Sequence, residues 1–191
     1  MDIIVTRYIG IRGTALAARF GYENLLKRYP KWLVDEAAAF DEDLLYEDDV
    51  MPEIGISLKE GAVYAEEYTE FGVFEALFQM SKAIKHGIRV GIKDIPIKQE
   101  TVEIAEFFKA NPYAMYSGYS AVIVSDNGVS LCERLIDEGI PAVIVGHTTD
   151  DNDKILINED EESFLPHIRK DELKIILGRK EYHERTDLNH S

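Results

Sequence analysis

Apolar and polar residues alternate most regularly between positions 111 and 148, where the pattern predicts a strand, a helix and a second strand. Ala121–Val124 is a short run of apolar, mostly β-branched residues, which favours a strand. The helix after it has apolar residues at helical spacing: Val129, Cys132, Leu135 and Ile136. Gly139 lies where a left-handed helix cap is expected, and Pro141 prevents the helix from continuing before the second strand, Ala142–Val145.

The same spacing rules predict the other elements. Apolar positions three to four residues apart predict helices at Gly13–Arg28, Lys31–Tyr46, Phe71–His86 and Val102–Lys109. Gly87 is the expected cap of the third of these. Strands are predicted at Ile88–Ile97, Lys154–Ile157 and Leu173–Leu177, and residues 54–57 and 62–65 are strand or turn. This set predicts an α+β sandwich with helices packed on a sheet.

Length and composition add that the chain is one globular unit. Its 191 residues, 46% of them hydrophobic, suffice for one core, which we place in residues 1–178, with a polar tail at 179–191 that we expect to fray. No apolar run reaches the roughly 18 residues of a membrane span, and the N-terminus lacks a secretory pattern. One cysteine cannot form an internal disulfide, so a cytoplasmic location is the default expectation.

The formal charge of −15 excludes some partners. It opposes binding to nucleic acid or to an anionic membrane surface. The acids concentrate at Asp35–Glu53 and Asp150–Glu162, but residues 150–153 lack the glycine and the distal glutamate of a calcium loop. These stretches are therefore interpreted as solvated surface rather than as metal sites, with attraction of a basic partner to the first one left open.

Few side chains suggest independent catalysis. Cys132 falls on the apolar face of its predicted helix, where a cysteine behaves as a small hydrophobe. The five histidines show no zinc-binding spacing, and His147 follows a strand as an ordinary surface residue would. Residues 10–13 match neither a phosphate-binding loop nor a dinucleotide fingerprint.

Several short motifs together resemble a known family. They are Ile4–Thr6, Ile9–Ala15, Asn111–Tyr113, Ser117–Gly118 and Ile144–Thr148. In order and spacing they are similar to the C-terminal domain of the aminoimidazole ribonucleotide (AIR) synthetase superfamily, closest to its hydrogenase maturation carbamoyl dehydratase branch. The resemblance covers most of residues 1–150 and implies a layered sandwich with a mixed, largely antiparallel sheet.

The resemblance also implies a ligand site. Members of the superfamily carry a His-Asp pair, a threonine and two glycines that open a helix, where backbone N–H groups approach an anion. Here Glu66 and Glu67 stand at the pair, Thr69 matches, Phe71 replaces the first glycine and Gly72 keeps the second. The phenylalanine and the additional glutamate oppose a phosphate. The implied ligand-binding residues are Glu67, Thr69, Gly72, Ser117 and Gly118.

Two functional hypotheses follow from the superfamily features that this sequence lacks. In the superfamily an N-terminal domain supplies most ATP and magnesium contacts, and this chain begins where the second domain begins; it also ends in Ser191, not in the cysteine that accepts a carbamoyl group. The first hypothesis is a ligand-binding or assembly module, a homodimer without cofactor or ATP hydrolysis in isolation. The alternative is half of a split enzyme, in which a separate N-terminal-domain protein supplies Mg-ATP. A lone enzyme with its own ATP site ranks last.

Overall fold

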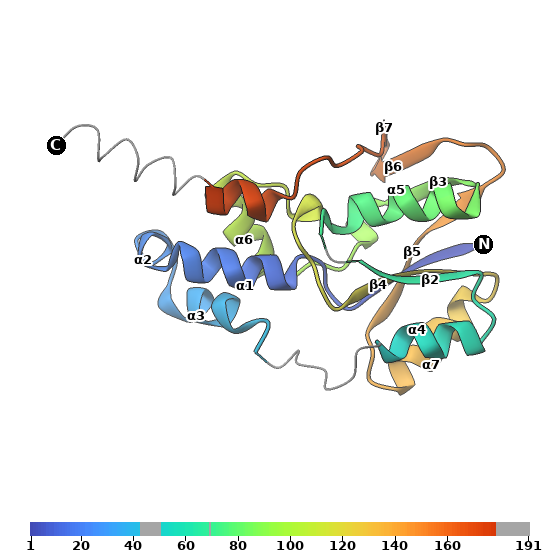
Figure 1. Ribbon diagram of the computed structural model, residues 1–191, viewed down its shortest axis with the longest axis horizontal. Helices are drawn as coiled ribbons and strands as arrows, with labels where there is room; N and C mark the ends of the chain where they lie inside the picture. The colour runs from blue at the N-terminus through green and yellow to red at the C-terminus, as the bar shows by residue number, and fades with distance from the viewer. Residues whose placement is uncertain (43–50, 69, 179–191) are drawn as a thin grey trace.

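The computed structural model describes residues 1–42, 51–68 and 70–178 (Figure 1). Its strands are β1 (Asp2–Thr6), β2 (Tyr64–Tyr68), β3 (Gly87–Gly91), β4 (Ser120–Ser125), β5 (Ala142–Thr149), β6 (Lys154–Asn158) and β7 (Glu161–Phe164). Its α-helices are α1 (Ile11–Phe20), α2 (Tyr22–Leu25), α3 (Lys31–Ala39), α4 (Pro52–Lys59), α5 (Gly72–Ile84), α6 (Gln99–Phe108) and α7 (Gly128–Asp137). Residues 172–178 are also helical. Ile92–Asp94 and Pro112–Ala114 form single 3-10 turns.

The described strands form one mixed sheet in the order β2-β4-β1-β5-β3-β6-β7. Only the β3–β6 pair is parallel among them, so the predicted α+β sandwich with a largely antiparallel sheet is confirmed. β4 and β5 lie on either side of β1, and both are antiparallel to it. They are therefore parallel to each other, as the predicted strand–helix–strand unit requires.

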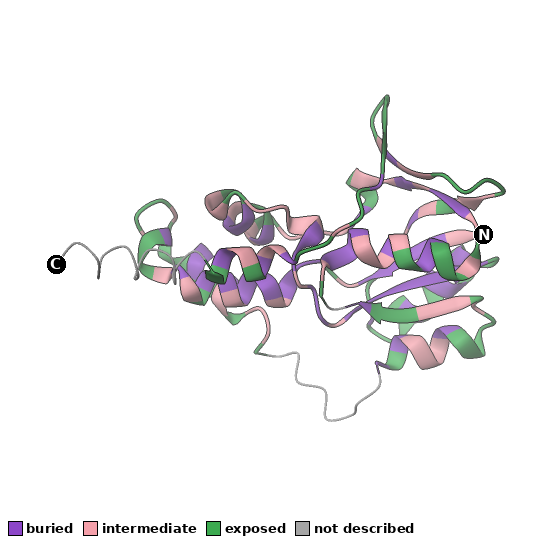
Figure 2. Ribbon diagram, turned by 45° about the horizontal axis from the view of Figure 1, so that its top comes forward, coloured by how far each residue is buried: buried purple, intermediate pink, exposed green. Residues whose placement is uncertain are grey.

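Helices cover both faces of the sheet (Figure 1). Side chains alternate between the faces of a strand, so neighbouring residues of β1 belong to different cores. Ile3 and Val5 pack with the apolar face of α5, whereas Ile4 packs with α7, and α4 adds partly buried residues on that side. Because helices cover both faces of the sheet, β4 is buried along its whole length (Figure 2), and hydrophobic residues can occupy both of its faces.

A third cluster lies beyond the end of the sheet. It joins α1, α3, α6 and the 172–178 helix around buried residues that include Leu25, Val34, Ile104 and Ile176. α1 ends at Phe20, and its C-cap is Gly21, where a Cβ would lie 2.5 Å from the ring of Phe108. The predicted helix Gly13–Arg28 is therefore two helices, α1 and α2.

Several predicted boundaries were wrong. Residues 54–57 lie in α4, and residues 173–177 lie in a helix and not in a strand. The predicted strand Ile88–Ile97 ends at Gly91, and the cap of α5 is Lys85 in a left-handed conformation, not Gly87. β7 was not predicted. The predicted tail 179–191 and the end of the predicted helix Lys31–Tyr46 lie outside the described residues.

The two edge strands are acidic. β2 carries Glu66 and Glu67 and β7 carries Glu161 and Glu162, and all four are exposed. Charged side chains on an edge strand oppose its pairing with another strand. Over the described parts of the chain, every helix falls short of the length and apolar character that a membrane span needs.

Candidate functional site

The loop between β2 and α5 has the backbone geometry of a glycine pair. Phe71 and Gly72 both have positive φ angles, 65° and 68°. A Cβ on Gly72 would overlap the carbonyl oxygen of Tyr113 and lie 2.9 Å from the amide nitrogen of Met115. Glycine is therefore required at 72, while Phe71 adopts a conformation that costs a non-glycine residue about 1–2 kcal/mol.

A carboxylate of the chain itself lies at this end of α5. Asp171 is 1% exposed. Its Oδ2 accepts the N–H of Phe71 at 2.7 Å, and its Oδ1 accepts the N–H groups of Leu173 at 2.8 Å and Tyr116 at 3.3 Å. Backbone N–H groups at a helix N-terminus favour an anion, and here the side chain of Asp171 supplies it.

Residues 165–178, which we call the strap, hold Asp171 against α5. The N–H of Ile168 donates to Oε2 of Glu75 at 3.0 Å, and the ring of His167 stacks on Phe78 at 4.6 Å. Nζ of Lys174 lies 2.9 Å from Oε2 of Glu70. The strap thus contacts the N-terminal half of α5 before its helix enters the third cluster (Figure 1).

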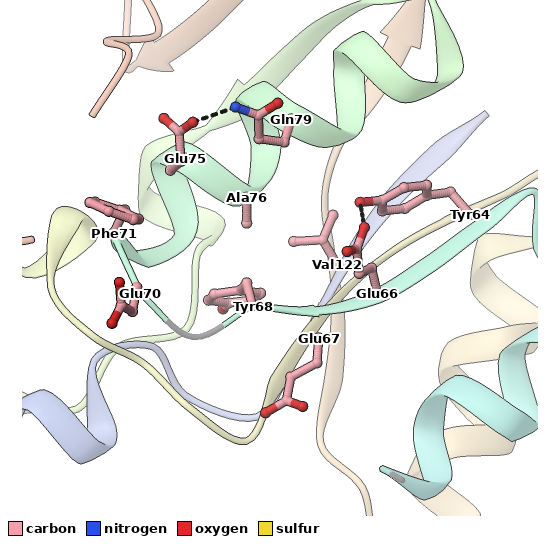
Figure 3. Close-up of a pocket in the computed structure, with 10 residues that line it drawn as sticks. All are labelled: Tyr64, Glu66, Glu67, Tyr68, Glu70, Phe71, Glu75, Ala76, Gln79 and Val122. Carbon is pink, nitrogen blue, oxygen red and sulfur yellow. Dashed lines mark hydrogen bonds between the residues drawn. The ribbon is translucent and has the colours of Figure 1, made fainter. Parts of the chain in front are cut away.

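Beside α5 lies a pocket of about 360 Å³ lined by glutamates and aromatic rings (Figure 3). Glu66 accepts a hydrogen bond from the hydroxyl of Tyr64, while Glu67 points away from both (Figure 3). Adjacent residues of a strand face opposite sides, so the two glutamates do not form a paired site. Burial raises the pKa of Tyr64, with the Glu66 bond as the second cause, and burial also raises the pKa of Tyr68.

The other predicted site residues take different positions. Ser117 is fully buried, and its Oγ accepts the N–H of Gly10 at 2.9 Å, which ties the start of α1 to the loop before β4. Gly118, with a φ of 61°, lines a second pocket of about 250 Å³. Gly72 is buried under the backbone of residues 113–115, and Glu67 lines the first pocket. Thr69 lies outside the described residues.

Cys132 and His147 have the surroundings expected from the sequence. Cys132 is 9% exposed, and burial raises the pKa of its thiol to about 11, so it stays protonated at neutral pH. His147 is exposed on β5. Among the residues that the structure describes, no three His, Cys, Asp or Glu side chains are grouped to hold a metal ion.

Comparison with known families decides which one this fold represents. The model of the family described as "AIR synthase related protein, C-terminal domain" matches residues 2–158. The chain belongs to this family. No curated protein matches it.

Solved structures share the AIR-synthase-related fold at low identity. HypE from E. coli superposes with a TM-score of 0.67 and 16% identity, over 92% of this chain and 52% of HypE. A HypE–HypF complex gives 0.60 and 18%, over 86% and 52%. Thiamine-monophosphate kinase from Stenotrophomonas maltophilia K279a gives 0.58 and 15%, over 85% and 51%. This chain therefore spans about half the length of the structures it matches.

Sequence reasoning missed Asp171, which lies beyond the residues that the AIR-synthase-related family model matches. One signal could have found it: an aspartate is a preferred N-cap, and Asp171 caps the 172–178 helix through Leu173. Its contact with Phe71 joins positions 100 residues apart, which no local pattern indicates. Lys98 and Tyr8 of the second pocket were not predicted either.

Proposed function

We propose that this chain is a ligand-binding or assembly module that does not hydrolyse ATP by itself. The observation that supports it is the carboxylate of Asp171 at the N-terminal end of α5. A phosphate group placed there would have to displace Asp171, which is fully buried and accepts three backbone N–H groups. The anion position of the glycine-pair loop is thus filled from within the chain.

The charges around the loop support the same proposal. Glu66, Glu70 and Glu75 line the neighbouring pocket, and its described lining contains no lysine or arginine. The nearby Lys174 already pairs with Glu70 at 2.9 Å. Two like charges about 4 Å apart repel by about 4 kcal/mol near a protein surface, so a triphosphate would be strongly disfavoured here.

Calorimetric titration with Mg-ATP tests the absence of ATP binding. We expect no heat of binding from the 191-residue chain up to about millimolar nucleotide. Asp171→Ala, which empties the anion position, is the matched variant. Micromolar binding by the unmodified chain would contradict the proposal, because it would mean that this domain alone forms a nucleotide site.

For the assembly role, the proposed partner is a second copy of the chain. Three large apolar side chains, Leu58 on α4 and Val129 and Ile136 on α7, are 54%, 64% and 55% exposed. The two helices lie side by side on one face of the sheet (Figure 1). Apolar groups exposed together on one face are typical of an interaction surface.

Sedimentation equilibrium tests this assembly role. We expect a dimer that Ile136→Glu dissociates, while Val102→Glu, at another exposed apolar position on α6, leaves it intact. A monomer at all concentrations would contradict the homodimer and leave the ligand-binding role as the proposal.

The alternative function is half of a split ATP-dependent enzyme. It is favoured by one observation: this chain spans about half the length of the HypE and thiamine-monophosphate kinase structures. It predicts that a separate N-terminal-domain protein binds this chain and that Mg-ATP binds only to the pair. Titration of the mixture with Mg-ATP distinguishes this alternative, since a module without nucleotide chemistry shows no binding in either case.

A further inference from the structure

The second pocket differs in chemistry from the rest of this acidic molecule. Its volume is about 250 Å³, and its walls include Arg7, Tyr8, Phe40, Lys98, Gly118 and Tyr119. No aspartate or glutamate is among its described lining residues. In a chain with a net charge of −15, a pocket lined by two cations and three aromatic rings is a local reversal of charge.

Lys98 supplies the charge of this pocket. Its side chain is half-buried, with Nζ 4.4 Å from the ring centroid of Phe40 and 5.7 Å from that of Tyr8. Within the described parts of the chain it forms no ion pair, in contrast with Lys93, which pairs with Glu159. An ammonium group held between rings keeps its charge available to an anion.

Arg7 is fixed in a different way. Its Nε lies 2.8 Å from Oε1 of Glu53, whose side chain is fully buried. Glu53 also accepts the hydroxyl of Thr6 at 3.4 Å. The pair compensates the charge of Arg7 and holds its stem in the pocket wall, so that Lys98 carries the net positive charge.

Three wall residues of the pocket have a left-handed backbone. Arg7, Gly118 and Tyr119 have φ angles of 58°, 61° and 59°. The left-handed region costs a non-glycine residue about 1–2 kcal/mol, and such strain gathers where a ligand site needs a fixed shape. Two non-glycine residues of this kind lie in the wall of one small pocket.

We propose that this pocket binds a small aromatic anion, a ring that carries a carboxylate or a phosphate. The ring would lie between the aromatic walls, with its anionic group at Lys98. The volume is below the roughly 300–1,000 Å³ of sites for drug-sized ligands, which limits the ligand to about one ring and its substituent. This inference rests on the proposed ligand-binding role and names the ligand class.

A titration with benzoate followed by amide NMR shifts tests the proposal. We expect binding in the millimolar range or tighter, with the largest shifts at Tyr8, Gly118 and Tyr119. Benzamide has the same ring without the charge and should bind at least about tenfold more weakly, and benzylammonium should not bind. Phenyl phosphate carries a phosphate in place of the carboxylate of benzoate. Binding of either anion supports the proposal, and the tighter of the two identifies the anionic group that the pocket prefers.

Matched variants locate the charge. Lys98→Met keeps the apolar stem and should weaken benzoate binding at least about tenfold, whereas Lys93→Met makes the same charge change outside the pocket and should not. Thermal unfolding checks that both variants fold. Equal binding of benzoate and benzamide, unchanged binding by Lys98→Met, or no shifts up to about 10 mM of either anion would overturn the proposal.

The benzoate titration uses no nucleotide, so its outcome is independent of the Mg-ATP titration that tests the function proposed above. If the aromatic anions do not bind and Mg-ATP does not bind either, the ligand class is wrong and the assembly role stands. If Mg-ATP binds to the chain, the proposed lack of nucleotide binding fails, whatever benzoate does.

Discussion

The N-terminal end of α5 and the pocket at Gly118 each contain a glycine that the resemblance implied for ligand binding, but the two places differ in what fills them. Both have consecutive residues with positive φ angles, Phe71–Gly72 in the first and Gly118–Tyr119 in the second. At α5 the carboxylate of Asp171 takes the position of an anion. At Gly118 the wall is cationic and aromatic, and its described residues add no carboxylate.

The comparison teaches that similar backbone geometry can accompany different chemistry within one molecule. The pair Phe71–Gly72 before α5 is left-handed although one of its residues is a phenylalanine, and Asp171 of the strap accepts the N–H of Phe71. A site whose donors are satisfied internally has little to offer an external anion. The pocket at Gly118 retains an unneutralised cation within the described structure and is the better binding candidate.

Gly72→Ala should have the largest effect, because the new methyl group would overlap the Tyr113 carbonyl oxygen. We expect a loss of about 4 kcal/mol in the free energy of unfolding, measured in urea. Gly139→Ala is the control: its φ is 77°, yet its Cβ would meet open space, so only the backbone cost of about 1–2 kcal/mol applies. Equal losses would show that close packing under residues 113–115 does not matter.

Asp171→Ala should come next, since it leaves buried N–H groups of Phe71, Tyr116 and Leu173 without their acceptor. We expect a loss of about 3 kcal/mol in unfolding free energy. Formate, a small carboxylate, should recover part of it by binding at the vacated position, measured as a rise in melting temperature.

The control for formate rescue is Asp151→Ala. Asp151 also accepts a backbone N–H, from Asp153 at 2.9 Å, but it is exposed, so water can replace it. Formate should not change the melting temperature of that variant. If formate stabilises both variants or neither, the end of α5 is not an anion position, and the contrast with the Gly118 pocket loses its basis.

Ligand stabilisation should be smaller. Benzoate at about ten times its dissociation constant should raise the unfolding free energy of the unmodified protein by about 1.4 kcal/mol, because it binds only the folded state. The gain should fall to about 0.4 kcal/mol or less in Lys98→Met and persist in Asp171→Ala, measured as shifts in melting temperature. Loss of the gain in Asp171→Ala would mean that the two regions are coupled.

Phe71→Gly should have the smallest effect. It relieves the left-handed strain but loses partly buried ring surface and increases chain entropy, so we expect a gain of about 0.5 kcal/mol. Lys85→Gly, at the exposed left-handed cap of α5, loses no buried surface and should gain about 1 kcal/mol. Urea unfolding measures both. A loss above about 1 kcal/mol for Phe71→Gly would show that the packing of its ring against the strap stabilises the fold.

Apolar periodicity predicted the elements whose whole pattern lies within one continuous segment of the chain. The unit β4–α7–β5 and the helix α5 have long apolar periods, and both were found. α4 was missed because its eight residues include Gly55, and because Ile54 and Ile56 stand two positions apart, which is the apolar spacing of a strand. Residues 173–177 at the end of the strap were predicted as a strand because they form a short apolar run, whereas in the structure Leu173 and Ile176 pack against distant helices.

The candidate site was only partly predictable for a similar reason. The resemblance named Gly72, which lies at the start of α5, and Gly118, which lies in a pocket wall. It named Glu67 and not Glu66 as a ligand residue, but it did not indicate their opposite orientations, which follow from their places on a strand (Figure 3). Neither Asp171 nor Lys98 is near these positions in the chain, so only the folded structure brings them together.

The acidic edges of the sheet have a consequence for the protein in salt. Glu66 and Glu67 on β2 and Glu161 and Glu162 on β7 would oppose each other if two molecules met strand to strand. Dissolved salt screens the repulsion between exposed charges, with a screening length of about 10 Å at 0.1 M and about 3 Å at 1 M. In concentrated salt both borders of the sheet therefore become templates for cross-molecular pairing. Protein kept in such a solution should form filaments, whereas the same protein in dilute buffer should stay dispersed.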